Sequence, residues 1–201
     1  MKELKIMLYL GIDIGRTETN YGLIDDQGEL GDIKTIKTPM ESLTQFLDMM
    51  GDIYDEYANQ IDGMAISMPG IIQSKTGYAV HGGSLKYIKK MNMVEMLETR
   101  CQTTIHVEND GKAATLGELW KGNLKGIQHA IMLNLGTGIG GGIVVNGDVL
   151  KGHHYSAGEF SFIKTNSARS KDADYMFGFQ NGIKKLFQNI AYQCELPLES
   201  I

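Results

Sequence analysis

Glycine, hydroxyl and carboxylate residues gather in four short segments of this chain, and these residue types suit the binding of phosphate and sugar hydroxyls. In the first segment, Gly11–Thr17, an apolar run leads through Asp13 into a tight turn. Backbone N–H groups at Gly15, Arg16 and Thr17 can bind phosphate oxygens. The Asp13 carboxylate can hold a hydrated Mg²⁺. Taken alone, the segment is also compatible with an ordinary hairpin whose turn is stabilised by an aspartate.

The second segment is a run of glycines over residues 135–142. It contains the G-x-G-x-x-G spacing of dinucleotide sites, but that interpretation requires a helix to follow. Here the apolar residues after the run and the Asn146-Gly147 pair predict a strand and a hairpin instead. Because glycine destabilises regular structure, a phosphate-binding turn explains the run better than a purely structural loop does. The residues predicted to bind phosphate are Gly136, Thr137, Gly138, Gly140 and Gly141.

The third segment, Glu108-Asn109-Asp110, lies at the end of an expected strand, where α/β sheets usually bind their ligands. Asp110 could accept a proton from a hydroxyl while Asn109 hydrogen-bonds a neighbouring hydroxyl. Asp110 could equally be the N-cap of the helix that follows. Both alternatives remain open at this point.

The fourth segment is Ser156–Phe160, in which Glu159 follows a glycine among apolar residues. Glu159 could accept hydrogen bonds from two adjacent sugar hydroxyls, or it could be a solvated surface glutamate. Further upstream, Gly82 and Gly83 lie in a stretch, residues 71–90, that we expect to be rich in loops. Glycines there would let the backbone approach a ligand closely.

The elements that must position these segments alternate between strands and helices, which predicts an α/β fold. An antiparallel meander opens the chain, and the meander pattern returns after residue 128. Apolar residues at steps of three and four predict a helix over residues 43–57, whose apolar face is also a candidate surface for a homodimer. The expected strands are 6–14, 20–24, 30–38, 61–68, 104–107, 128–135 and 142–145, and the other expected helices are 93–100, 111–120 and 182–193.

Composition narrows the classes of function. The net charge of −5 argues against a nucleic-acid partner, which would require a basic surface. The two cysteines fit neither a disulfide framework nor a zinc spacing. Because the chain lacks an apolar run long enough to cross a membrane, we expect no membrane association and a cytoplasmic protein.

In combination, the four segments resemble the ROK family of sugar kinases, within the actin-like ATPase superfamily. The resemblance covers essentially the whole chain. It implies an α/β, ribonuclease H-like fold of two lobes with a cleft between them, the second lobe being incomplete in this chain. The first lobe would cover residues 1–115, and the start of the larger lobe residues 116–201. The matching positions are Asp13, Gly15, Thr17, Asn109, Asp110, Gly136–Gly142 and Glu159.

The sequence departs from the usual family pattern at several positions. Most members carry a histidine where this chain has Phe162, followed by a zinc-binding cysteine cluster, whereas residues 163–190 here contain no cysteine. We therefore expect no zinc. Together with the Gly82–Ile88 segment, this pattern is similar to the β-glucoside kinase branch. Arg16 stands where the family usually has glycine, and it could either reach a phosphate oxygen or crowd the turn.

The resemblance implies an ATP- and Mg²⁺-dependent kinase that phosphorylates a hexose or β-glucoside hydroxyl, the 6-hydroxyl in that branch. Asp110 would be the general base, and Asn109, Glu159, Gly82 and Gly83 would bind the sugar. A degenerate ROK protein that binds sugar without turnover is the main alternative. A ROK repressor is disfavoured because the first phosphate motif begins by residue 11, which leaves no room for a DNA-binding helix-turn-helix. Another ATPase of the superfamily is disfavoured by the Ala-Gly-Glu segment at residues 157–159.

Overall fold

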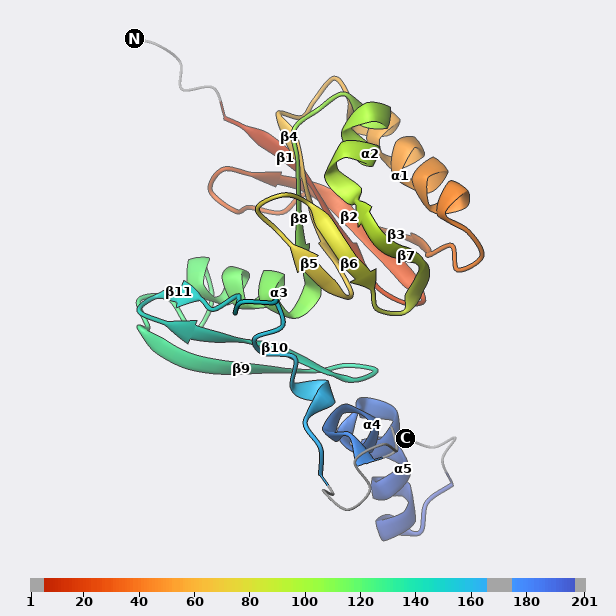
Figure 1. The fold of residues 1–201 in the computed structure, drawn as a ribbon, viewed down its shortest axis with the longest axis vertical. Coiled ribbons are helices and arrows are strands. Elements are labelled where there is room, and N and C mark those ends of the chain that lie inside the picture. The colour runs from red at the N-terminus through yellow and green to blue at the C-terminus, as the bar shows by residue number, and fades with distance from the viewer. Residues whose placement is uncertain (1–5, 166–174, 198–201) are drawn as a thin grey trace. The chain divides into compact units, whose positions relative to one another are not determined.

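The structure is a computed structural model, and it describes residues 6–165 and 175–197. The chain forms two compact units, Met1–Ala113 and Ala114–Ile201 (Figure 1). The division falls inside the helix α3 (Asp110–Trp120), as does the boundary expected from the sequence. Each unit is described by itself below.

A five-stranded sheet forms the centre of the first unit, in the order β3-β2-β1-β4-β8. The strands β1, β2 and β3 form the expected antiparallel meander, while β4 and β8 run parallel to β1. The mixed α/β class predicted from the sequence is therefore confirmed. The strands are β1 (Leu8–Ile14), β2 (Glu18–Asp25), β3 (Lys34–Lys37), β4 (Gly63–Met68) and β8 (Ile105–Asn109).

The helix α1 (Leu43–Tyr57) begins and ends where the apolar spacing predicts, and the Ser42 side chain caps its N-terminus. Its buried side chains, among them Phe46 and Met50, pack into the core beneath the sheet. The suggestion that this apolar face mediates a homodimer is therefore wrong, because the face is already buried within its own unit. The helix α2 (Met93–Cys101) lies beside α1 (Figure 1).

Gly51 in α1 leaves room for the side chain of Arg100 between these two helices. A Cβ at Gly51 in α1 would collide with the guanidinium of Arg100 in α2. With only hydrogen at Gly51, Arg100 reaches Asp55 through two hydrogen bonds of 3.1 and 2.7 Å. This pair is exposed, so its net contribution to stability is small.

The expectation of a loop-rich stretch over residues 71–90 is wrong. These residues form a three-stranded antiparallel sheet, ordered β5-β6-β7. Gly77 and Gly83 lie in the connections between these short strands and Gly82 is the last residue of β6, which gave the sequence its loop-like appearance. The strands are β5 (Ile71–Gln73), β6 (Tyr78–Gly82) and β7 (Leu85–Asn92).

The second unit contains a three-stranded antiparallel sheet, ordered β11-β10-β9. The strands are β9 (His129–Leu135), β10 (Ile139–Val145) and β11 (Asp148–Val149). A short 3₁₀ helix, η1 (Phe160–Phe162), follows, and then the helices α4 (Phe177–Asn181) and α5 (Ile183–Cys194). In the described parts of the chain, no helix combines the length and hydropathy needed to cross a lipid bilayer.

Candidate active site

The candidate site in the first unit lies where three parallel strands end. Register places Asp13 of β1 beside Ser67 of β4, and Ser67 beside Glu108 of β8. The next residue pair along β4 and β8 is Met68 and Asn109. Ligand sites of α/β sheets typically lie at this carboxyl edge. The sheet thus brings Asp13 and the 108–110 segment, which are about a hundred positions apart in the sequence, to one edge.

The Asp13 carboxylate is exposed and accepts a hydrogen bond of 2.7 Å from the Ser67 hydroxyl. This bond restrains one carboxylate oxygen and leaves the group accessible to solvent. Carboxylate and hydroxyl oxygens suit Mg²⁺, which is usually held by one or two carboxylates and several waters. The pair therefore fits a hydrated magnesium ion.

Asn109 is only 4% exposed, and all of its side-chain polar atoms are engaged. Its amide nitrogen donates to the Gly70 carbonyl oxygen at 2.9 Å and to a carboxylate oxygen of Asp110 at 3.0 Å. Its side-chain oxygen accepts from the Lys112 N–H at 3.0 Å. Asn109 therefore caps the helix α3, the role that we had considered for Asp110.

The Asp110 side chain is held by short-range bonds in an exposed position. The same carboxylate oxygen that accepts from Asn109 also accepts from the Gly111 N–H at 2.7 Å. Since Asp110 is the first residue of α3, the helix N-terminus also favours its negative charge. The arrangement gives an oriented and exposed carboxylate.

Gly82 and Gly83 join this group through the Pro69-Gly70 turn. A Cβ at Gly70, whose φ is +111°, would collide with the His81 carbonyl oxygen. A Cβ at Gly83, whose φ is +59°, would lie 3.1 Å from the Gly70 nitrogen. The two turns thus pack backbone to backbone, and Gly70 also accepts the bond from Asn109.

The turn after β1 is braced by threonine hydroxyls. The Gly15 N–H donates to the Glu18 carbonyl at 2.9 Å, and the Thr38 hydroxyl donates to the Gly15 carbonyl at 2.9 Å. The Thr19 and Thr38 hydroxyls are 2.8 Å apart and buried. Arg16 is exposed and has no positive φ, so the turn accommodates its side chain without backbone strain. The phosphate contact of Arg16 stays a prediction.

The glycine run in the second unit is divided between a turn and a strand. Only residues 136–138 form the connection, while Gly140 and Gly141 lie within β10, contrary to the expectation of a single glycine turn. Packing requires glycine at Gly141, because a Cβ there would collide with the Met132 carbonyl oxygen of β9. At Gly136, by contrast, the nearest atom would be 3.9 Å away. A Cβ would therefore be tolerated at Gly136, whereas at Gly138 it would lie 2.8 Å from the Ser161 hydroxyl.

Three later segments hold this turn in place. The Ser161 hydroxyl bonds both the N–H and the carbonyl of Ile139, each at 2.9 Å. The Ile183 N–H, at the start of α5, donates to the Gly136 carbonyl at 2.9 Å. Gly158 packs against the backbone of residues 141 and 142. The position of Glu159, directly after Gly158, is thereby tied to the glycine turn.

Glu159 directly precedes η1 and is half-buried, so it is not a fully solvated surface glutamate. Phe162, which stands where most ROK members have a histidine, is 55% exposed. In the residues that the structure describes, no three His, Cys, Asp or Glu side chains group as a metal site.

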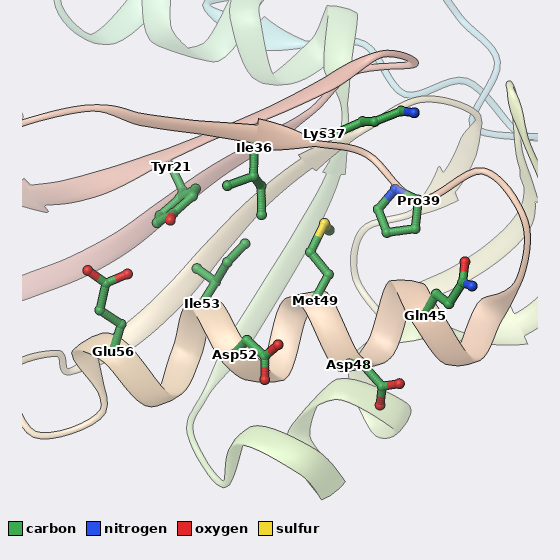
Figure 2. A pocket seen from close by; sticks show the side chains of 10 residues that line it. All are labelled: Tyr21, Ile36, Lys37, Pro39, Gln45, Asp48, Met49, Asp52, Ile53 and Glu56. Atoms are coloured by element: carbon green, nitrogen blue, oxygen red, sulfur yellow. The ribbon is translucent and has the colours of Figure 1, made fainter.

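A separate groove of about 480 Å³ lies between β3 and α1. Met49 and Ile53 point from the helix toward Ile36 and Tyr21 on the sheet (Figure 2). None of the residues that we predicted to bind sugar, phosphate or metal lines this groove. The groove is therefore separate from the candidate site, which lies at the ends of the strands.

Sequence reasoning missed two residues of the site, Ser67 and Gly70. Both lie in Ser67-Met68-Pro69-Gly70, which we interpreted only as the end of a strand. The signal that could have identified them is the same one used for Asp13 and Asn109, namely polar residues and glycine directly after a buried parallel strand. Lys112 was also missed, and it is fully buried in the first turn of α3.

Comparison with known proteins identifies the family. The pattern of the ROK family matches residues 9–176. A β-glucoside kinase of Listeria monocytogenes is 32% identical over 157 residues, which are 78% of this chain and 53% of the relative. A glucokinase of Halalkalibacterium halodurans is 30% identical over 163 residues, covering 77% of this chain and 49% of the relative. The chain thus spans about half the length of these curated relatives.

Solved structures give the same result. The Lmo2764 protein of Listeria monocytogenes is 30% identical, with a TM-score of 0.84 over 97% of this chain and 67% of that protein. A ROK family protein of Streptococcus pneumoniae, solved in complex with sucrose, is 26% identical, with a TM-score of 0.75 over 94% of this chain and 63% of that protein. The actin-like ATPase fold predicted from the resemblance is thereby confirmed. Matched by the family pattern from residue 9 to residue 176, this chain belongs to the ROK family.

Proposed function

We propose that the protein is an ATP-dependent sugar kinase that transfers the γ-phosphoryl group of ATP to a hydroxyl of a hexose or β-glucoside, with Asp110 as the general base. The names of its relatives, β-glucoside kinase and glucokinase, support this reaction class. The 6-hydroxyl is the proposed acceptor, by analogy with the β-glucoside kinase branch that the sequence resembles.

One observation carries the proposal: a buried asparagine holds the carboxylate of Asp110 at the carboxyl end of β8. The amide of Asn109 is fixed by Gly70 and by the N-terminus of α3, and it orients Asp110 at 3.0 Å. Asp110 accepts the proton of the attacking hydroxyl, which is worth roughly 10²–10⁴ in rate. Gly82 and Gly83 are assigned to the sugar by the resemblance, although the space beside each is filled by Ile88 and by the Pro69-Gly70 turn.

The phosphate and metal ligands follow from the turn after β1. The Gly15 N–H is bonded to the Glu18 carbonyl, so in this proposal the N–H groups of Arg16 and Thr17 bind the terminal phosphates of ATP, and the Arg16 guanidinium adds a phosphate contact. Asp13 and Ser67 would hold Mg²⁺ through water, and a bound ion would supply neutralisation of charge on the phosphoryl oxygens.

The second unit supplies two further groups in this proposal. The Gly136 N–H is bonded to the Gly138 carbonyl, so the N–H groups of Thr137 and Gly138 are the ones that bind phosphate in this proposal. Glu159 accepts hydrogen bonds from sugar hydroxyls. The packing of Gly158 on residues 141 and 142 supports a fixed spacing between these two groups.

The test is Asp110→Asn, assayed by ADP release with glucose, N-acetylmannosamine, cellobiose and gentiobiose and by calorimetric titration of the same sugars. We expect retained sugar binding and a loss of turnover of roughly 10²–10⁴, because the amide cannot accept the proton. Asp32→Asn, at an exposed position outside the site, is the matched control and should keep full turnover.

If the turnover rate of Asp110→Asn is close to that of Asp32→Asn, Asp110 is not the general base. Absence of binding for every sugar in the panel would overturn the sugar-kinase proposal itself. For Glu159→Gln we expect a raised KM for the sugar with a smaller change in kcat, and an unchanged KM would contradict its assignment.

The second candidate function is that of a ROK protein that binds sugar without turnover. The reason for considering it is that Phe162 stands where most members have a histidine. Thermal stabilisation by a sugar from the panel, without ADP release in the presence of ATP and Mg²⁺, would favour this function.

A further inference from the structure

The groove between β3 and α1 combines an apolar floor with an acidic wall. Its volume of about 480 Å³ is that of a binding pocket, which typically measures roughly 300–1,000 Å³. Met49 and Ile53 of α1 face Ile36 and Tyr21 of the sheet across it (Figure 2). These four side chains form the floor, and none of them belongs to the site proposed for sugar and ATP.

The helix α1 contributes carboxylates to the groove at intervals of one helical turn. Asp48, Asp52 and Glu56 line the groove, and all three are exposed. Glu56 forms an ion pair with Lys34, and Arg100, which lies near Asp52, pairs with a neighbouring aspartate of α1. In the described part of the chain, neither Asp48 nor Asp52 has a hydrogen bond or an ion pair. The groove therefore keeps two carboxylates for a cationic partner.

The other side of the groove is the edge of a sheet. β3 is the last strand of the five-stranded sheet, and among the described residues it pairs only with β2. The N–H of Thr38, directly after β3, donates to the carbonyl of Thr17, directly before β2, at 3.0 Å. Backbone groups alternate in direction along an antiparallel strand. The N–H and C=O groups of Thr35 and Lys37 therefore point to the free edge.

An edge strand and a helix that enclose an apolar groove can bind an extended peptide by strand addition. The main chain of the peptide pairs with the free edge, and its alternate side chains point into the groove. These alternate side chains are about 6.6 Å apart along a strand, and residues four apart on a helix are separated by about 6 Å along its axis. Two neighbouring groove-facing side chains of the peptide can therefore meet Asp48 and Asp52 together.

We propose that this groove binds an extended segment of a partner protein in which one apolar side chain and two Lys or Arg side chains occupy successive groove-facing positions. The main chain of the segment adds to the free edge of β3. The apolar side chain packs on the floor, and the basic side chains pair with Asp48 and Asp52. Lys37 extends away from α1, so it does not face the basic side chains of the segment (Figure 2). The inference concerns a binding surface and is independent of the proposed kinase activity.

The charge of β3 disfavours a second copy of this chain as the occupant. Antiparallel pairing of two β3 edges would bring Lys34 and Lys37 of one copy close to those of the other, and like charges in cross-strand positions are destabilising. Lysines on an edge strand are a common means of preventing such self-pairing. A segment of a different protein therefore fits the groove better.

The experiment measures the binding of synthetic peptides to the 201-residue chain by calorimetric titration and by amide hydrogen exchange. The probe is Thr-Leu-Thr-Arg-Thr-Arg-Thr, blocked at both ends, together with its reversed sequence, because a strand can add in either direction. We expect one of the two peptides to bind. In the complex, the amides of Thr35 and Lys37 should exchange at least tenfold more slowly, while that of Ile36, which faces β2, should stay unchanged.

The double variant Asp48→Asn/Asp52→Asn should weaken binding at least tenfold, because the arginines lose both of their partners. Asp32→Asn/Asp148→Asn removes the same charge at exposed positions outside the groove, so it is the matched control and should bind as the unmutated chain does. A peptide with proline in place of its two inner threonines should not bind, because proline lacks the N–H that pairs with a strand edge.

Failure of both peptides to bind at about 1 mM would overturn the proposal, as would equal binding by Asp48→Asn/Asp52→Asn and its control. Equal binding of the proline peptide, or binding without slower exchange at Thr35 and Lys37, would also overturn it, since the edge of β3 would then take no part. A dimer of the chain alone that Asp48→Asn/Asp52→Asn disrupts would overturn it too, because the occupant would be a second copy. None of these measurements uses ATP turnover, so an inactive kinase would not affect their outcome.

Discussion

The two glycine turns have one proposed task, phosphate binding, but they are held by different means. The turn after β1 is braced by two hydroxyls, those of Thr19 and Thr38, and Thr38 lies 23 residues after Gly15. The turn after β9 is held by three later segments, through Gly158, Ser161 and Ile183. The first turn therefore depends on one pair of hydroxyls, whereas the second depends on the correct folding of several segments of its unit.

The largest effect should come from Gly141→Ala in the second unit. The added Cβ would collide with the Met132 carbonyl oxygen, so β9 and β10 must separate. We expect a loss of about 3 kcal/mol in the free energy of unfolding, measured by thermal or urea denaturation.

Gly136→Ala is the matched change at the turn itself. Space is open there, so stability should change by less than about 0.5 kcal/mol. If the turn binds phosphate, the methyl group should still weaken ATP binding on the order of tenfold, or about 1.4 kcal/mol, as measured by calorimetry. Equal ATP affinity in Gly136→Ala and the unmutated chain would contradict the phosphate role.

Thr38→Val tests the bracing of the first turn. The change keeps the shape of the side chain but removes the donor to the Gly15 carbonyl and the partner of the buried Thr19 hydroxyl. We expect a loss of about 1–3 kcal/mol in unfolding free energy, because a buried polar group loses its partner. The double variant Thr19→Val/Thr38→Val should recover part of that loss, and failure to recover would argue against the hydroxyl pair.

Ser161→Ala removes the bracing of the second turn at Ile139. We expect a smaller loss, about 0.5–1.5 kcal/mol, because the group is only partly buried and water can replace the hydroxyl. Hydrogen exchange of the Ile139 amide should accelerate while that of Gly15 stays unchanged. Acceleration at both turns would show that the two are not braced independently.

The smallest expected effect is the pH dependence of folding stability that comes from Cys101. Burial raises the pKa of the Cys101 thiol to about 11, from an ordinary value of 9.0. The folded state therefore keeps this thiol protonated at pH values where the unfolded state ionises it. Stability from this group is complete below pH 9 and is lost as the pH rises toward 11.

Denaturation of Cys101→Ala across this pH range should show a shallower decline than that of the unmutated chain. Cys194→Ala is the control, because Cys194 is exposed. A thiol reagent should likewise modify Cys194 in the native protein and Cys101 only after unfolding. Rapid modification of both thiols in the native protein would contradict the burial of Cys101.

Local signals predicted the elements well where one buried face dominates. Apolar spacing identified α1 to the residue, and the opening meander was recognised from its turns. The short strands β5, β6 and β7 were missed because their connections contain glycines, and their stability comes from pairing with each other. Pairing between strands is non-local, so the sequence of one segment does not reveal it.

The candidate site was predictable in its residues but not in its contacts. Asp13, Asn109 and Asp110 were identified from their places after apolar runs. The roles of Ser67 and Gly70 depend on the parallel register of β1, β4 and β8, which a single segment does not specify. Likewise, the steric need for glycine at position 141 arises from β9 and could not be separated from a phosphate role by composition.

Asn109 hydrogen-bonds both Asp110 and the first turn of α3, and these two roles affect how ROK sequences should be compared. Its side chain starts the helix α3 as well as orienting Asp110, so selection for folding alone would preserve it in a descendant that has abandoned catalysis. The carboxylate of Asp110 is exposed. If Asp110 is the general base, as proposed, the acid at position 110 is a better marker of an active protein than the amide beside it.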